Sequence, residues 1–164
     1  MPIDVADNNV VTVGVGDYKI ARSPKLLKTL LGSCIGIALY DPTTKIGGLL
    51  HIMLPKRNGD GAQKASKYAD TGIPAMISQM VGVAGAHRSL LTAKIFGGAQ
   101  MFSVNNCLFD IGRRNEDEVR RVLQVEGIRI LACRTGGNKG YQITFDTNTG
   151  RINCRIFGET TEEY

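Results

Sequence analysis

Two residues of this chain have the types needed for nucleophilic acyl chemistry, and both lie in apolar, strand-like segments: Cys34 and His51. A thiolate is a strong nucleophile, and an adjacent imidazolium lowers the pKa of a cysteine thiol, ordinarily about 8.5, by several units. The same imidazole can then protonate a leaving amine. The pair therefore predicts acyl transfer or amide hydrolysis, provided that the fold brings the two side chains together.

A predicted β-hairpin brings them together. Residues 35–40 are rich in aliphatic side chains, residues 41–44 have turn chemistry, and residues 45–54 form a second apolar run. A turn at residues 41–44 sets Cys34 directly opposite His51, and the Cβ atoms of such partners are about 4.5–5.5 Å apart. The hairpin therefore predicts a thiol and an imidazole within reach of one another.

The two faces of this hairpin differ in side-chain size. One face is a continuous aliphatic layer, whereas the cysteine face carries the small residues Gly36, Ala38 and Gly47, which leaves room above the sheet. A slip of one residue would put Cys34 and His51 on opposite faces. A lone cysteine and a lone histidine in apolar strands are more often core residues, so this register is what favours catalysis.

Neighbouring groups could assist such a pair. The backbone N–H groups around Gly32 and Ser33 are candidates for an oxyanion hole, because glycine lets the chain approach a substrate closely. A third group usually orients the base. Thr29 is the first hydroxyl candidate for that role, ahead of the turn threonines at 43 and 44.

The remaining pattern is mostly strands. We expect strands at residues 9–15, 91–96 and 128–133, and a closing hairpin of residues 141–146 and 151–157. Two helices are expected. An apolar stripe predicts the first from Asp70 or Thr71 to Ala84, and Asn115 as N-cap with Glu118 three residues later predicts the second, ended by Gly127. The fold class is mixed α/β, α+β-like: a layered domain with a mostly antiparallel or mixed sheet and two main helices.

Composition narrows the function classes. The 164 residues predict a single domain over 1–164, with a core at about 13–157 and an acidic tail at 158–164. A net charge of +5 without a concentrated basic stripe, and only 6% aromatic residues, argue against nucleic-acid binding. No apolar run reaches the roughly 18 residues of a membrane span, and no secretory signal is apparent, so we expect a cytoplasmic protein without membrane insertion.

The other thiols and the second histidine give no further site. Cys107, Cys133 and Cys154 form no C-x-x-C pair, and we expect all three to be small buried hydrophobes. His87, next to Arg88, is expected on the surface at a helix end. No spacing fits zinc, a phosphate loop or a dinucleotide fingerprint, so no metal and no cofactor is expected.

Several segments together resemble a known family. They are Leu31-Gly32-Ser33-Cys34, Gly48-Leu49-Leu50-His51-Ile52-Met53-Leu54-Pro55, Lys67-Tyr68-Ala69-Asp70, Lys94-Ile95-Phe96-Gly97-Gly98-Ala99, Met101-Phe102, Ile111-Gly112-Arg113-Arg114-Asn115 and Thr135-Gly136-Gly137. In this order, over about residues 13–157, they resemble the chemoreceptor glutamine deamidases of chemotaxis, the CheD family.

This resemblance implies a cysteine-dependent amidohydrolase that acts on glutamine side chains of receptor cytoplasmic helices. It implies a layered fold similar to toxin deamidases, with Cys34 as nucleophile, His51 as general base and a threonine before the cysteine as third residue. Thr29 is that threonine, one residue nearer to Cys34 than the family pattern places it. Many members also bind the phosphatase CheC. The alternatives are a non-enzymatic regulator that mainly binds a CheC-type phosphatase, and a cysteine peptidase or acyltransferase.

Overall fold

The computed structural model describes residues 9–59, 63–100 and 110–164. The first sheet consists, in spatial order, of β1 (Val10–Thr12), β3 (Leu26–Leu31), β8 (Tyr141–Asp146), β9 (Ile152–Ile156) and β10 (Thr161–Glu163). The second sheet consists of β2 (Asp17–Arg22), β5 (Ile46–Ile52), β4 (Ile35–Asp41), β6 (Thr92–Gly97) and β7 (Arg129–Thr135). The helices are α1 (Ala69–Gly82) and α2 (Ile111–Val125), with short 3₁₀ turns at Ala65–Lys67 and Arg88–Leu90.

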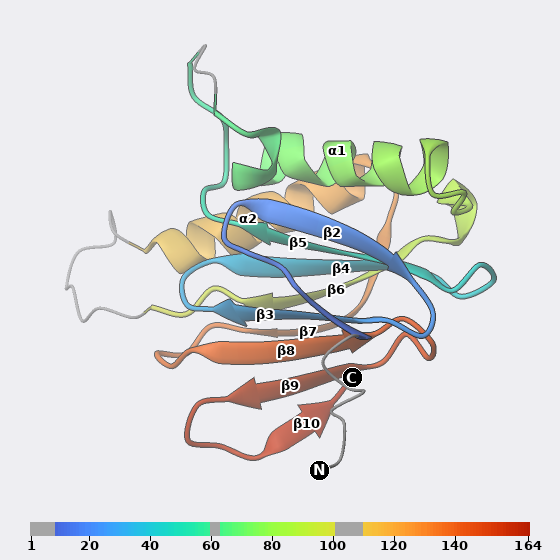
Figure 1. Cartoon of the computed structure of the whole chain (residues 1–164). Coiled ribbons are helices and arrows are strands. Elements are labelled where there is room, and N and C mark those ends of the chain that lie inside the picture. The colour runs from blue at the N-terminus through green and yellow to red at the C-terminus, as the bar shows by residue number, and fades with distance from the viewer. Residues whose placement is uncertain (1–8, 60–62, 101–109) are drawn as a thin grey trace.

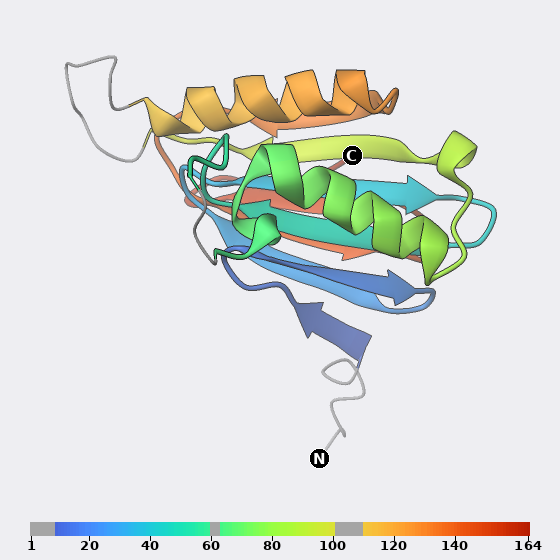
Figure 2. The same ribbon diagram turned by 90° about the horizontal axis from the view of Figure 1, so that it is seen from above.

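The elements form three layers. The first sheet packs on one face of the second sheet, and α1 and α2 cover the other face (Figures 1 and 2). Strand pairs are antiparallel except β1 with β3 and β6 with β7, which are parallel. The predicted layered α/β class with two main helices is confirmed, although the strands divide into two sheets.

Strand β5 shows how the second sheet packs against both the helices and the first sheet. Leu50 packs in the cluster beneath the helices, whereas Leu49 packs in the cluster between the sheets. A Cβ on Gly47 would lie 2.7 Å from the ring of Phe145, and one on Gly48 would lie 2.8 Å from Sδ of Met80. These glycines let both outer layers approach closely. The expectation of open space above the cysteine face is therefore wrong, because the first sheet occupies it.

The hairpin of β4 and β5 has a different register from the predicted one. Its turn comprises residues 42–45, because Asp41 still pairs with Ile46. The Asp41 carboxylate accepts a hydrogen bond from the Thr43 N–H at 2.9 Å, and Lys45 adopts a left-handed φ of 54°. The register thus differs by two residues, so His51 faces Gly36 rather than Cys34. A two-residue shift keeps every side chain on its predicted face.

The predicted start of α1 is wrong. The helix begins at Ala69, with Tyr68 as its N-cap, so neither Asp70 nor Thr71 caps it. Asp70 instead accepts a hydrogen bond from the backbone N–H of Arg57 at 3.0 Å. The motif around this helix start therefore fastens the preceding loop to the helix.

The predicted start of α2 is also wrong. Asp110 is the N-cap, and its side chain accepts a hydrogen bond from the N–H of Arg113 at 3.2 Å. Asn115 consequently lies inside the helix and is fully buried. The predicted end is confirmed, because the chain leaves the helix through Gly127, at a φ of 71° that favours glycine.

Three strands, β2, β3 and β10, were not expected from the sequence. Strand β2 pairs with β5 and forms one edge of the second sheet. Strand β10 lies in the expected acidic tail. The end of the tail packs as well, since the Tyr164 ring meets Phe96 edge-on at 5.4 Å and its carbonyl accepts from Nζ of Lys94 at 3.0 Å. This C-terminal stretch is therefore an edge of the first sheet.

The remaining cysteines and His87 have mixed outcomes. Cys154 is buried as predicted, whereas Cys133 is exposed on β7, an edge strand. Cys107 and the Met101-Phe102 segment lie outside the described residues. His87 follows no helix end, and its Nδ1 and backbone N–H contact the buried Asp41 carboxylate at 3.1 and 2.8 Å. The expected helix-dipole role of His87 is therefore wrong.

Candidate active site

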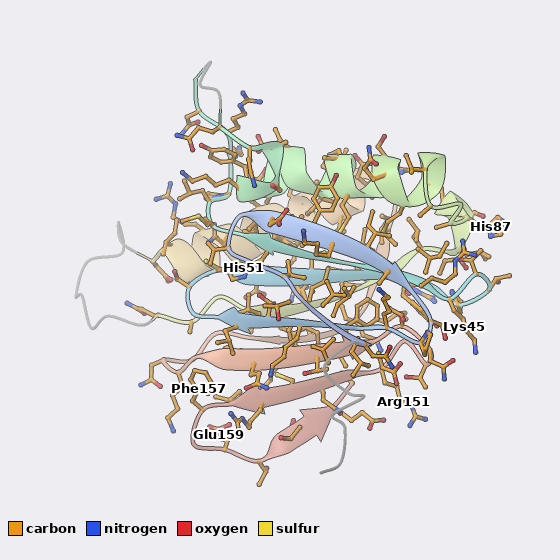
Figure 3. All side chains as sticks on the ribbon, in the orientation of Figure 1. Lys45, His51, His87, Arg151, Phe157 and Glu159 are labelled. Atoms are coloured by element: carbon orange, nitrogen blue, oxygen red, sulfur yellow. The ribbon has the colours of Figure 1, made fainter. Side chains whose placement is uncertain are left out.

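The chain crosses between the two sheets at the candidate nucleophile. Strand β3 of the first sheet ends at Leu31, and β4 of the second sheet begins at Ile35. Cys34 thus closes a short crossing segment, and its thiol is free and half-buried. His51 lies near the end of β5, at the opposite end of the strands from Lys45 (Figure 3).

Cys34 and His51 lie on the face of the second sheet that meets the first sheet. His51 is the direct partner of Gly36, and Cys34 precedes Gly36 by two residues on the same face. Cys34 packs against the cluster between the sheets. Diagonal neighbours of this kind are about 7–8 Å apart between Cα atoms, within reach of long side chains. The predicted common face is therefore correct, and the predicted direct pairing is not.

A hydrogen bond across the two sheets fixes the tautomer of His51. Oγ1 of Thr29 lies 2.8 Å from Nδ1 of His51 and 2.8 Å from the carbonyl oxygen of Val13. A carbonyl oxygen can only accept, so the single hydroxyl proton goes to Val13 and the hydroxyl oxygen accepts from Nδ1–H. The ring proton is therefore on Nδ1, and Nε2 carries a free lone pair. Thr29 thus occupies the place of the predicted third residue.

The lone pair of Nε2 is unpaired within the described residues. His51 is 2% exposed, and its Nε2 has no hydrogen-bond partner among the described residues. The thiol of Cys34 is accordingly not yet hydrogen-bonded to it. Catalytic contacts are often loose without substrate and tighten in the reacting complex.

Burial keeps both groups neutral in the resting site. It raises the pKa of the Cys34 thiol above its ordinary value and lowers the pKa of His51 to about 4. The expected imidazolium that depresses the pKa of Cys34 is therefore not the resting state. The arrangement instead fits a neutral imidazole that accepts the thiol proton when a substrate is attacked.

The pH dependence of turnover should reflect this state. Protonation of His51 removes the base, and its pKa of about 4 places the acid limb of kcat/KM near pH 4. We expect a nearly constant kcat/KM from about pH 5.5 to 8, measured by ammonia release. Far-UV circular dichroism over the same range controls for unfolding. A half-maximal rate near pH 6.5, the ordinary histidine value, would contradict the assigned resting state.

The crossing segment is held by its carbonyl groups. The N–H of Ala99 donates to the carbonyl of Gly32 at 2.9 Å, and the N–H of Gly98 donates to the carbonyl of Cys34 at 2.8 Å. Gly97 makes this approach possible, because a Cβ there would lie 2.3 Å from the Cys34 oxygen. The N–H groups of Ser33 and Cys34 have no acceptor within the described ranges, so they are available to a substrate oxygen.

Sequence reasoning missed one polar residue of this site. Nδ2 of Asn115, in α2, donates to the carbonyl of Ser33 at 3.1 Å and to the carbonyl of Met53 at 3.0 Å. Asparagine ahead of an apolar run is typical of an N-cap, and this preference concealed the residue. Its place in the Ile111-Gly112-Arg113-Arg114-Asn115 segment was the available signal.

Residues 9–59, 63–100 and 110–164 contain no group of three or more side chains suited to hold a metal ion. Within the same ranges, neither helix has the length and hydrophobicity to cross a bilayer.

Comparison with known proteins identifies the family. Residues 53–156 match the family model "CheD chemotactic sensory transduction", a range that starts just after His51. A protein of Desulforamulus reducens named "Probable chemoreceptor glutamine deamidase CheD" is 48% identical over 155 residues, covering 92% of this chain and 93% of its own. Proteins of the same name from Caldanaerobacter subterraneus subsp. tengcongensis and Methanococcus vannielii are 44% and 41% identical, covering 93% and 89% of this chain and 96% and 94% of their own. The chain belongs to the CheD family.

Proposed function

We propose that this chain is a protein-glutamine deamidase that converts glutamine side chains of chemoreceptors to glutamate through a thioester on Cys34. The observation that carries the mechanism is the hydrogen bond from Nδ1 of His51 to Thr29, which leaves the basic Nε2 on the face of Cys34. The names of the relatives supply the substrate class.

The first half of the reaction forms the thioester. The Sγ–H proton of Cys34 passes to Nε2 of His51 as sulfur bonds to the carboxamide carbon. The carbonyl oxygen becomes an oxyanion, which the N–H groups of Ser33 and Cys34 stabilise, with Gly32 permitting close approach. The C–N bond then breaks, the nitrogen takes the proton from Nε2, and ammonia leaves.

The second half regenerates the enzyme. Water attacks the thioester carbon while Nε2 of His51 accepts a proton from it. The C–S bond breaks, the sulfur of Cys34 recovers the proton, and the side chain leaves as glutamate. Each step uses the same imidazole nitrogen, which is why one fixed tautomer serves both halves.

The surface near His51 suits a helical protein substrate. The N–H of Gly16 donates to the His51 carbonyl at 2.8 Å, and Val15 and Met53 beside it are 58% and 37% exposed. These two exposed side chains offer a small apolar area beside the strand end that carries His51, and apolar surface of this kind can contact another protein. A receptor helix could place its glutamine at Cys34 while its apolar side chains contact Val15 and Met53. Binding of a CheC-type phosphatase stays a prediction.

Ammonia release tests the proposal. We expect the purified chain to release ammonia from a folded, glutamine-bearing receptor fragment and to convert glutamine to glutamate, as read by peptide mass. A non-enzymatic regulator would bind the fragment without ammonia, and a peptidase would shorten it. Either result would overturn the deamidase assignment.

A further inference from the structure

Asn115 links the two backbone segments that carry the candidate catalytic residues. Its Nδ2 group donates to the carbonyl of Ser33, immediately before Cys34, and to the carbonyl of Met53, two residues after His51. The side chain is completely buried. A single amide group on α2 therefore sets the position of the nucleophile segment against the end of the strand that carries the base.

The bond to Ser33 also determines where a neighbouring N–H points. A peptide unit is planar and trans, so the Ser33 carbonyl and the Cys34 N–H point in opposite directions. Because Asn115 holds the carbonyl, it turns the Cys34 N–H toward the other side of the segment. The carbonyl of Gly32, held by the Ala99 N–H at 2.9 Å, orients the Ser33 N–H in the same way.

Helix α2 is packed tightly enough to hold this position. A Cβ on Gly112, in its first turn, would lie 2.4 Å from the carbonyl oxygen of Gly98 and 2.8 Å from that of Ala99. The segment that holds the carbonyls of Gly32 and Cys34 therefore rests directly on the helix that carries Asn115.

The Asn115 amide can adopt only one of its two flipped orientations. Two carbonyl oxygens face the group, so only the NH₂ side can point toward them. Its Oδ1 is left buried without a partner among the described residues. A buried acceptor without a partner destabilises the folded protein. A residue that keeps such a cost is more readily explained by function than by stability.

We propose that Asn115 is a positioning residue that aims the Cys34 N–H at the oxyanion of the reacting carboxamide. The inference rests on the proposed deamidase function and adds a residue to it. Asn115 acts through the backbone and does not touch the substrate.

Two substitutions of similar size test the role of Asn115. Asn115→Asp turns a carboxylate toward two carbonyl oxygens, and Asn115→Leu removes both donors. Loss of an oxyanion-hole donor lowers kcat about 10²–10³-fold, and misalignment of a donor should cost somewhat less. For both variants we expect kcat to fall about 10–100-fold with KM changed less than about threefold. The control is Thr147→Val, which removes a buried side chain–backbone bond to Lys25 and should leave kcat unchanged.

Alkylation of Cys34 by iodoacetamide separates positioning from loss of fold. The alkylation reaction needs the thiol and its base but forms no oxyanion. Its rate at Cys34, followed by peptide mass, should therefore differ less than about threefold between each Asn115 variant and the wild type. Alkylation that falls in parallel with kcat, or variants as active as the wild type, would overturn the role of Asn115 alone. Wild-type protein that releases no ammonia would overturn the deamidase function and the inference together.

A measurement on the wild type does not depend on how the variants fold. A receptor peptide with an aldehyde in place of the glutamine carboxamide adds the Cys34 thiol reversibly. The C–S bond forms, the Sγ–H proton moves to the former carbonyl oxygen, and that oxygen takes the position of the oxyanion. In that adduct we expect the Cys34 amide proton to shift downfield in NMR spectra and the Asn115 Nδ2 protons to stay protected from exchange. Rapid exchange of those side-chain protons in the adduct would overturn the proposal.

Discussion

Cys34→Ala is expected to abolish ammonia release from a receptor fragment, with a fall in kcat on the order of 10⁴-fold or more. His51→Ala should have a comparable effect, because the neutral thiol needs Nε2 to accept its proton. The double variant should be no worse than either single one, since residues that act as a unit do not contribute additively. Initial rates of ammonia release at saturating fragment measure all three effects.

Cys133→Ala is the matched control for the nucleophile. Cys133 is a free thiol exposed on β7, so its replacement removes a reactive group without disturbing the core. We expect the kcat of this variant to stay within about twofold of the wild type, because substitutions of surface residues in other proteins rarely change stability much. Wild-type turnover by Cys34→Ala would show that the nucleophile has been assigned wrongly.

Thr29→Val is expected to lower kcat on the order of 10²-fold and to change KM little. The substitution keeps the shape of the side chain but removes the oxygen that accepts from Nδ1–H of His51. The imidazole then loses its fixed orientation, and a small misplacement of a catalytic group can cost about 10²-fold. Steady-state kinetics give the two parameters, and ¹⁵N NMR of His51 reports its tautomer.

Thr29→Ser is the control for this effect. It keeps the hydroxyl and should retain kcat within about tenfold, with the Nδ1–H tautomer unchanged. Urea unfolding of both variants is needed, because an unpaired buried group alone costs about 1–3 kcal/mol of stability. Equal kcat values for Thr29→Val and the wild type would remove Thr29 from the site.

The sequence was enough to predict that Cys34 and His51 share one face, but not how the two residues pair. The alternation of large and small residues in residues 35–54 was enough to put Cys34 and His51 on one face, because side chains alternate along a strand. The exact pairing was not, because residues 41–44 and 42–45 both make plausible turns. The choice depends on Lys45, whose left-handed φ of 54° no residue preference indicates.

Other features depended on contacts that a local pattern does not contain. Thr29 was proposed from its closeness to Cys34 in the sequence, but its bond to His51 depends on how the two sheets pack. Asn115 looked like a cap because asparagine favours caps, and only the packing of α2 shows otherwise. Strand β2 was missed although apolar Tyr18 and Ile20 alternate with polar Asp17 and Lys19, because the alternation is short and this edge strand is only partly buried.

The hydrogen bond between Thr29 and His51 joins residues from different sheets. The rate of turnover should therefore depend on how closely the two sheets pack. The hydrogen bonds of each sheet run within that sheet, so secondary structure could persist while the sheets separate slightly. The imidazole would then lose its partner first. Mild denaturant or high pressure should therefore abolish activity before the far-UV circular dichroism spectrum changes. Ligands that bind both sheets at once should extend the range of denaturant concentration and pressure over which the enzyme stays active.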